Sequence, residues 1–381
     1  MNFNLTDEQT LLQQTVRQFA EAEVAPGAIE RDETKTWPEE IVRQLAEMGL
    51  MGMMVPEQWG GAGMDTVAYT IAMEEISRAD AAVGVIMSVN NSLVCDLLDT
   101  YGTDEQKSKY LIPLAKGEKL GAYSLSEPQA GSDAANLLCR ARSDDDVYRI
   151  SGTKNWVSNG IHSDVVLLFA VTDPEQKHHG ISCFIVEKGW DGFSVGKPED
   201  KLGIRASDTS ELYFDDVKVP LANRVAAEGK GFHIALGTLD AGRIGIAAQA
   251  LGIAQAALDH ALAYAREREQ FGRPIIDFQA IQFKLADMAT QIEAARLLVR
   301  RAAFAKDQDQ PFGYLAAMAK VFASEVAMQA ASQCVQIHGG YGYIRETGVE
   351  RLMRDAKITQ IYEGTSEIQR VVIARALQKK G

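Results

Sequence analysis

A single carboxylate stands in a turn directly ahead of a helix start near the end of the chain. The segment 361–370 reads IYEGTSEIQR, and its first carboxylate is Glu363. Ser366 and Gln369 have the spacing of a capping box, which predicts a helix that begins at Ser366, and Gly364 supplies flexible backbone just before it. Catalytic groups often sit in loops held by rigid elements, so Glu363 is a candidate general base. An isolated glutamate ahead of a helix is more often a solvated surface residue, and this interpretation therefore depends on the rest of the sequence.

Two further segments carry hydroxyls, aromatic rings and exposed backbone in patterns suited to a large cofactor. The first is 123–133, YSLSEPQAGSD, followed by WVS at 156–158, and the second is 336–343, QIHGGYGY. Together with segment 361–370, these motifs resemble the acyl-CoA dehydrogenase family. The resemblance extends over essentially the whole chain, and the carboxy-terminal third is most similar to the short-chain, butyryl-type members.

The resemblance implies an FAD-dependent α,β-dehydrogenation of an acyl-CoA thioester to the trans-2-enoyl-CoA. Glu363 would take the α-proton while the β-hydrogen leaves as hydride to N5 of the flavin. In the family, the backbone amide of this glutamate and a ribityl hydroxyl of FAD stabilise the enolate character of the thioester. Desolvation raises the pKa of such a base, whereas the helix start at Ser366 lowers it. We therefore expect desolvation to prevail only in the complex with substrate.

The resemblance also assigns cofactor contacts to three groups of residues, most of which in isolation would be ordinary turn or surface residues. The first group would lie along the flavin ring, where hydroxyls and amides can donate to its nitrogens and oxygens: Tyr123, Leu125, Ser126, Gly131, Ser132, Trp156, Val157 and Ser158. The second would reach the FAD of a neighbouring subunit: Arg268, Phe271, Gln279, Gln336, Ile337, Gly339 and Gly340. The third would touch FAD from the subunit's own side: Thr365, Ser366 and Glu367. The second group implies an obligate oligomer, typically a tetramer in the family.

For the substrate, the positions that match the acyl-CoA cleft of the family are Ser132, Asp240, Arg243 and Gly364. Arg243 has an alternative interpretation as a structural ion-pair residue. Some branched-chain members of the family place their base on the helix that carries segment 240–243. That place is Gly242 here. Glu363 therefore has no competing carboxylate in the sequence.

Several alternatives within the same fold remain open at this point. An acyl-CoA oxidase, an enoyl-CoA reductase and a catalytically inactive scaffold share the motifs, and a yellow colour on purification would exclude the scaffold. The absence of a Ser-Lys-Leu terminus favours electron-transferring flavoprotein over oxygen as the electron acceptor. Acyl length and branching are open. A dicarboxylate substrate is disfavoured, because Gly84 stands where glutaryl-type members carry an arginine.

Composition narrows the class of protein. The chain has 381 residues, 46% hydrophobic and 24% charged, with a net charge of -13, which is typical of a globular protein and disfavours a nucleic-acid partner. The longest apolar run, 165–171, is too short to cross a bilayer, and the amino terminus shows no secretory signal, so we expect a cytoplasmic protein. The four cysteines are widely scattered and no His-Glu-x-x-His is present, which predicts buried free thiols and no metal site.

The order of patterns along the chain is helical, then β, then helical. Apolar residues at helical spacing dominate residues 1–120, short β-type runs separated by turn signals fill 121–226, and long helices return over 227–381. Neither a Gly-x-Gly-x-x-Gly nor a P-loop motif is present. We therefore predict a multidomain α+β protein. Its expected parts are an N-terminal helical domain, a middle β-barrel domain and a C-terminal four-helix bundle, as in the family fold.

Overall fold

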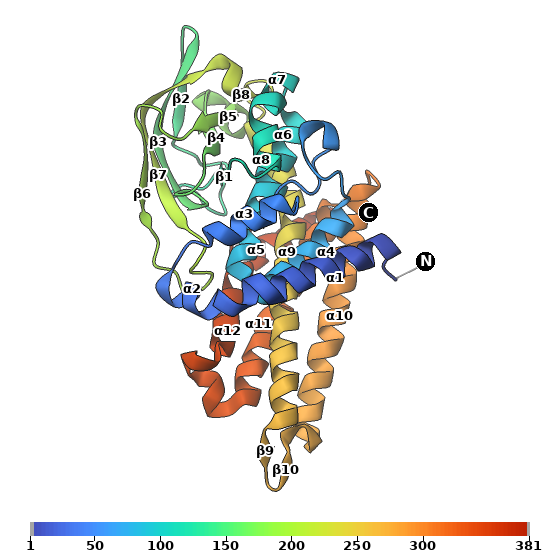
Figure 1. Cartoon of the computed structure of the whole chain (residues 1–381). Coiled ribbons are helices and arrows are strands. Elements are labelled where there is room, and N and C mark those ends of the chain that lie inside the picture. The colour runs from blue at the N-terminus through green and yellow to red at the C-terminus, as the bar shows by residue number, and fades with distance from the viewer. Residues whose placement is uncertain (1–3, 379–381) are drawn as a thin grey trace.

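The computed structural model describes residues 4–378 and shows the predicted order of a helical, a β and a second helical block (Figure 1). The first block contains α1 (Asp7–Phe19), α2 (Ala28–Thr34), α3 (Glu39–Glu47), α4 (Thr66–Ala79), α5 (Ala81–Ser88), α6 (Asp96–Tyr101), α7 (Asp104–Gln106) and α8 (Ile112–Ala115). Thr6 and Thr103 form capping boxes with Gln9 and Gln106. Each box satisfies backbone donors that a helix start leaves without partners.

One stretch of the first block is a continuous buried helix with an irregular turn. α5, a π-helical segment over Val89–Cys95 and α6 together run from Ala81 to Tyr101, and 94% of the most apolar window is buried inside the protein. By length and composition alone this helix could cross a membrane. Its burial identifies it as a core helix of the folded protein, and its π-helical turn places Leu93 beside the third block.

The middle block is a single sheet. It contains β1 (Gly121–Ser124), β2 (Arg140–Asp144), β3 (Val147–Ser158), β4 (Val165–Val171), β5 (Ile181–Glu187), β6 (Phe193–Pro198), β7 (Thr209–Pro220) and β8 (Arg224–Val225). The strand order is β6-β7-β3-β2-β4-β5-β8, and β1 lies parallel to β4. Every residue of β4 is buried, as its uninterrupted apolar sequence predicts. Since β6 and β8 are the two edges, the predicted β-barrel is an open one.

The third block consists of long helices. α9 (Gly231–Glu267), α10 (Gln279–Asp307) and α11 (Gly313–His338) pack lengthwise and are followed by α12 (Val349–Thr359) and α13 (Ser366–Gln378). One apolar stripe of α10, at near-heptad spacing, is buried: Leu285, Met288, Ile292, Ala295 and Val299. α9 has 37 residues, so it is about 55 Å long. It begins against β5, where a Cβ on Gly231 would lie 2.7 Å from the Cα of Ser182.

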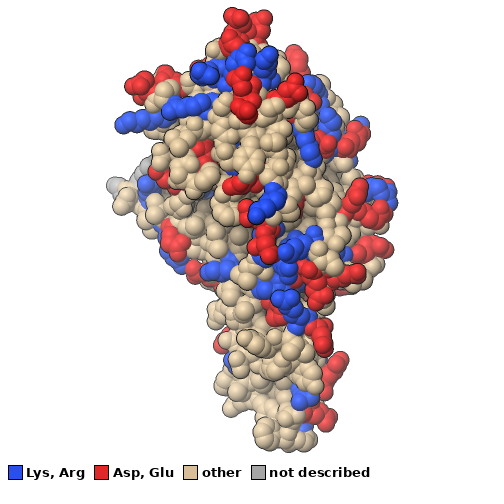
Figure 2. Space-filling model, turned by 90° about the vertical axis from the view of Figure 1, so that its left-hand side faces the viewer, with Lys and Arg blue, Asp and Glu red and all other residues tan. Residues whose placement is uncertain are grey.

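The far end of this bundle projects from the body of the molecule. A short hairpin of β9 (Glu269–Gln270) and β10 (Arg273–Pro274) joins α9 to α10 at its tip, on the side of the molecule opposite the β domain (Figure 1). Figure 2 shows charges of both signs mixed over the body and fewer charged side chains on the projection. Large apolar side chains are exposed there, among them Phe271 at 94% and Tyr343 at 86%.

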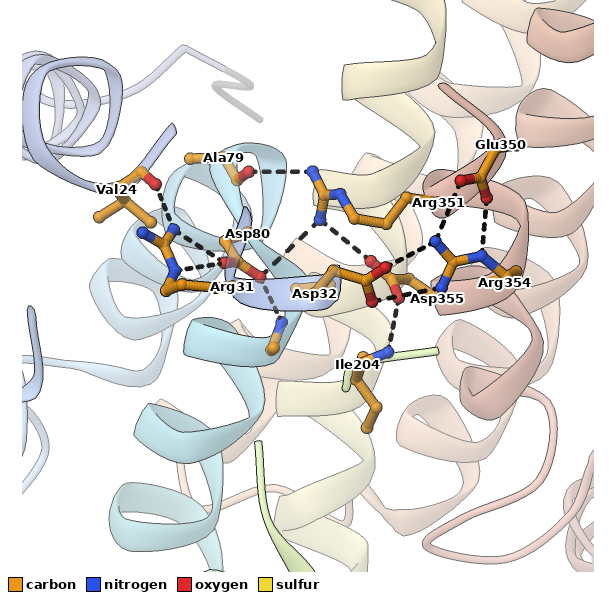
Figure 3. Close-up of polar contacts among 12 residues, drawn as sticks. Val24, Arg31, Asp32, Ala79, Asp80, Ile204, Glu350, Arg351, Arg354 and Asp355 are labelled. Atoms are coloured by element: carbon orange, nitrogen blue, oxygen red, sulfur yellow. Dashed lines mark hydrogen bonds and ion pairs between the residues drawn. The ribbon is translucent and has the colours of Figure 1, made fainter. Parts of the chain in front are cut away.

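A polar network ties the three blocks together (Figure 3). Arg354 of α12 pairs with Asp32 of α2 at 2.7 Å, and the neighbouring Arg351 pairs with Asp355 at 3.1 Å. The backbone N–H of Ile204, from the loop before β7, donates to Asp355 at 2.6 Å. Burial raises the pKa of Asp355 to about 6, although Arg351 and that N–H act in the opposite direction. The three blocks therefore pack as one body around α12.

Candidate active site

The turn that carries Glu363 lies between the end of α12 and the start of α13. The helix begins at Ser366, as predicted, but the predicted capping box is wrong: the cap is Thr365, whose Oγ1 accepts a hydrogen bond from the N–H of Ile368 at 3.3 Å. Gln369 is used differently. Its buried amide donates to the carbonyls of Glu363 at 3.2 Å and Gly364 at 2.9 Å. These carbonyls precede the helix and need a donor from outside it.

The backbone of this turn is in the left-handed region at two successive residues. Glu363 has φ of +52° and Gly364 has φ of +89°. Glycine tolerates this conformation at no steric cost, whereas a glutamate adopts it only when its surroundings hold it there. Such strain at a single carboxylate is the kind found at functional sites.

The carboxylate of Glu363 points at Gly242 on α9. A Cβ at position 242 would lie 2.2 Å from Oε2 of Glu363, 3.1 Å from its Cδ and 2.7 Å from Cδ2 of Leu93. Oε2 is buried and has no hydrogen-bond partner within the described part of the chain. The sequence-based inference that Gly242 and Glu363 face a common point is consistent with this contact, and only glycine fits at 242 beside the glutamate.

Burial raises the pKa of Glu363 to about 7, while the positive charges of Lys320 and Arg243 lower it. The expectation that desolvation would prevail only in a substrate complex is therefore wrong. Removal of water from the carboxylate by the protein itself outweighs the charges of both cations. A base with a pKa near 7 is matched to proton abstraction at neutral pH.

Sequence reasoning missed Lys320, which lies beneath the turn. Its side chain is fully buried on α11, and its Nζ donates to the carbonyl of Gly364 at 2.7 Å. A signal was present in the sequence: Lys320 occupies the same helical stripe as Ala316, Ala323 and Ala327, all of which are buried. A lysine in register with a buried apolar stripe is unusual and marks a position worth testing.

The two charged residues predicted on α9 form an ion pair. Asp240 accepts from Nη1 of Arg243, and burial raises the pKa of Asp240 above its ordinary value despite this partner. Arg243 is only 5% exposed, and its charge acts on Glu363. Asp240 is the partner that the interpretation of Arg243 as a structural ion-pair residue requires. The same geometry also keeps a cation beside the carboxylate.

The first group of predicted cofactor residues is gathered at one edge of the β domain. The N–H of Asn155 donates to the carbonyl of Ser126 at 2.9 Å, and Lys154, fully buried, donates to the carbonyl of Leu125 at 2.9 Å and to Glu127 at 2.8 Å. These contacts bring segments 123–132 and 156–158 together. Sequence reasoning missed Lys154 and Glu127, because only the fold shows that their charges meet inside the sheet.

The side chains of this group differ in what they can offer. Trp156 is 61% exposed and has φ of +59°, and a Cβ at Gly131 would meet nothing within 4 Å. Both observations indicate an open face that a large ligand could cover. Val157 and Leu125 are buried. The remaining members are half-buried or exposed: Tyr123, Ser126, Ser132 and Ser158.

Tyr123 links this edge to the carboxylate. Its hydroxyl donates to the carbonyl of Ala235 on α9 at 3.3 Å. Burial raises its pKa well above 10, and the negative charge of Glu363 adds to that effect while Arg243 opposes it. The mutual influence of these three groups places the β-domain edge, α9 and the Glu363 turn around one site.

The second group lies at the opposite end of the bundle. Arg268 follows α9 directly, about 40 Å along the helix from Gly242 by the α-helical rise. Its guanidinium lies 5.7 Å from the ring centre of Tyr341, within range of a cation–π contact. The exposed members are Arg268, Phe271, Gln279, Gln336, Gly339 and Gly340, whereas Ile337 is buried. Within one chain, this group and the Glu363 site are not brought together.

The remaining predicted contacts flank the Glu363 turn. Thr365 is half-buried, Ser366 is buried and Glu367 is exposed. Cys95, Cys139, Cys183 and Cys334 are free and buried, which confirms the prediction for the thiols. In the range 4–378, the structure holds no cluster of three His, Cys, Asp or Glu side chains that could bind a metal ion.

Comparison with known proteins assigns the family. Residues 6–118, 122–217 and 229–378 match the acyl-CoA dehydrogenase N-terminal, middle and C-terminal domains, respectively. The chain belongs to the acyl-CoA dehydrogenase family. It is therefore an oxidoreductase with the acyl-CoA dehydrogenase fold, and members of this family bind FAD.

Individual relatives match this acyl-CoA dehydrogenase over almost its whole length. A short-chain specific acyl-CoA dehydrogenase of Clostridium acetobutylicum is 52% identical over 98% of this chain and 99% of its own. The structure of butyryl-CoA dehydrogenase from Megasphaera elsdenii is similar with a TM-score of 0.98 and 48% identity, covering 99% of this chain and 100% of that one. A chain from a study of the electron transferring flavoprotein of Acidaminococcus fermentans matches with a TM-score of 0.98 and 49% identity over 99% of both chains.

Proposed function

We propose that this acyl-CoA dehydrogenase binds FAD and oxidises short-chain acyl-CoA thioesters to trans-2-enoyl-CoA in fatty acid metabolism, with Glu363 as the base. The observation that carries the proposal is the strained, half-buried Glu363, whose Oε2 is buried and unpartnered and whose pKa is raised by burial to about 7. The names of the relatives in Clostridium and Megasphaera support a short-chain substrate.

In this proposal, the chain's own residues perform the proton transfer. Glu363 accepts the α-proton of the thioester onto its carboxylate, and the backbone amide of the same residue donates to the thioester carbonyl oxygen, as the family resemblance implies. Asp240, Arg243, Ser132 and Gly364 line the acyl-CoA cleft. Bound FAD supplies the acceptor for the β-hydrogen and its two electrons. Burial of the carboxylate keeps it a stronger base than a solvated glutamate would be.

The cofactor residues present fit a flavin. The tied segments 123–132 and 156–158 offer hydroxyls, backbone amides and the exposed ring of Trp156 on one open face. Thr365, Ser366 and Glu367 would approach the cofactor from the start of α13. We assign the distant group around Arg268 to the FAD of a second subunit, since it lies too far along α9 to reach the same flavin.

That assignment requires a homo-oligomer, and we propose a tetramer. The exposed Phe271 and Tyr343 on the projecting bundle support an apolar contact with another copy. We further propose electron-transferring flavoprotein as the electron acceptor, supported by the similar chain from the study of the Acidaminococcus electron transferring flavoprotein, and a cytoplasmic location. The domain boundaries that we propose are 1–120, 121–226 and 227–381.

A kinetic panel tests the substrate. The purified, flavin-loaded protein is assayed with butyryl-, isobutyryl-, 2-methylbutyryl-, octanoyl- and glutaryl-CoA and an artificial electron acceptor. We expect the highest kcat/KM with butyryl-CoA or one of its branched analogues. A protein without bound flavin, or one that turns over none of the five, would contradict the proposal, and a preference for octanoyl- or glutaryl-CoA would contradict its short-chain part.

A further inference from the structure

The catalytic turn rests on a buried cation. Lys320 is fully buried on α11, and its Nζ donates to the carbonyl of Gly364, which also accepts from the amide of Gln369. Among the described residues, no carboxylate oxygen lies within 4.0 Å of Nζ, so the ammonium has no salt-bridge partner of its own. Burying an unpaired lysine is costly, which indicates that its position serves a purpose.

The charged and titratable groups around Lys320 come from several elements. On the catalytic turn is Glu363, on α9 is Arg243, and at the start of α13 is Glu367. Glu363 in turn acts on Tyr69 of α4 and Tyr123 of β1, and on its neighbour Tyr362. Burial lowers the pKa of Lys320 to about 8, although the two glutamates raise it. The side chain is therefore mostly a cation at neutral pH.

We propose that Lys320 is a positioning residue for the catalytic base: its hydrogen bond fixes the left-handed turn at Gly364, and its charge favours the ionised form of Glu363. The two effects use different properties of the side chain. Holding the carbonyl requires any donor of suitable length, whereas the electrostatic effect requires a positive charge. Gln369 shares the first task and, being neutral, has no part in the second.

This inference rests on the proposed role of Glu363, so its first readout does not depend on turnover. The carboxylic acid of Glu363 has an infrared C=O band that disappears on deprotonation, and the variant Glu363→Gln identifies the band. In flavin-loaded protein without substrate, we expect the midpoint of its titration to rise by about one pH unit in Lys320→Gln and in Lys320→Met. Lys320→Arg, which keeps the charge, should leave the midpoint close to that of the unsubstituted protein.

The second readout separates the hydrogen bond from the charge. The acid limb of kcat should move to higher pH in both neutral variants, because removing a nearby cation makes the carboxylate easier to protonate. The plateau of kcat at high pH should fall about tenfold or more in Lys320→Met only, since glutamine can still donate to Gly364.

Lys284→Met is the matched control. Lys284 lies on α10 and donates to Gln333, which is thirteen residues and about 20 Å further along α11 than Lys320. The control variant therefore removes an equal charge from the same bundle at a distance from the site. A buried lysine with a purely structural role would lower flavin content or melting temperature without moving either pH curve.

Unmoved midpoints in Lys320→Gln relative to Lys284→Met would overturn the inference, and Lys320→Gln and Lys320→Arg carry the test where Lys320→Met fails to fold. Failure of the proposed function has a different signature. In that case the unsubstituted protein turns over no acyl-CoA, while the infrared titration still reports whether Lys320 controls the Glu363 carboxyl.

Discussion

Glu363 owes its basicity to its surroundings, because burial raises its pKa to about 7 against the opposing charges of Lys320 and Arg243. We predict that Glu363→Gln retains FAD and the fold but loses roughly 10² to 10⁴ in kcat, since glutamine has a similar shape and cannot accept the proton. Turnover with butyryl-CoA and flavin absorbance measure the two properties. Glu40→Gln, an exposed change on α3, is the control. Turnover close to that of the control would exclude Glu363 as the base.

The same residue predicts the pH dependence of activity. Glu363 must be ionised to take the α-proton, and its pKa in the folded protein is above the ordinary value of a glutamate. Activity should therefore be lost as pH falls through about 7, about tenfold per pH unit below it, rather than through the range near 4.5. The measurement is kcat/KM for butyryl-CoA between pH 5 and 9. An acid limb centred below about pH 5.5 would show that the carboxylate is solvated.

At the scale of elements, α9 and the catalytic turn place Gly242 and Glu363 next to each other, so either position could carry the base. The variant Gly242→Glu alone should be inactive or misfolded, because its Cβ would lie 2.2 Å from Oε2 of Glu363. Glu363→Gly removes that atom and also places glycine at a left-handed φ. The double variant should therefore fold and recover part of the activity that Glu363→Gly abolishes.

The recovery should be partial for two reasons. Cδ2 of Leu93 would still lie 2.7 Å from the new Cβ and must move, and a base from α9 approaches the α-carbon along a different vector. The substrate preference should move toward branched chains. A folded, flavin-loaded double variant no more active than Glu363→Gly on any of the five thioesters would refute the common approach point.

The segments proposed to face the flavin, 123–132 and 156–158, are joined by a buried ion pair inside the β domain. Lys154→Met leaves Glu127 buried without its cation and frees the carbonyl of Leu125. We predict a loss of about 3–5 kcal/mol in the free energy of unfolding and weaker FAD binding. Urea denaturation and flavin titration measure these effects. The double change Lys154→Met with Glu127→Leu should recover most of the stability, because no charge is then left unpaired. Unchanged flavin affinity in Lys154→Met would show that other contacts hold the segments.

At the scale of the whole molecule, the two groups of cofactor residues lie at opposite ends of a 37-residue helix. We predict that Arg268→Ala weakens FAD binding and lowers the melting temperature of the flavin-loaded protein only, because a ligand bound to the folded state stabilises it by mass action. A tenfold loss of affinity corresponds to about 1.4 kcal/mol. Arg266→Ala, another exposed arginine two residues away, is the control. Equal flavin occupancy and melting in the two variants would make Arg268 a plain surface residue.

The sequence by itself determined what depends on local pattern. Capping residues set the starts of α1 and α7, and an uninterrupted apolar run became the fully buried β4. Apolar residues at near-heptad spacing form the buried stripe of α10. The sequence also indicated the motif around Glu363 and the family, because the motif residues are contiguous. These features need only neighbours within a few positions along the chain.

The tertiary structure alone decided which distant groups meet. Lys320 is 43 positions before Glu363, so no spacing rule could place it beside the carboxylate, whereas Gly242, 121 positions before Glu363, was placed there only by the family resemblance. Gln369 donates to the turn and does not form the predicted capping box. The reason is that the left-handed turn leaves carbonyls that a buried side chain must reach. The pKa of Glu363 is decided in the same way, since desolvation depends on how completely helices from distant parts of the chain exclude water.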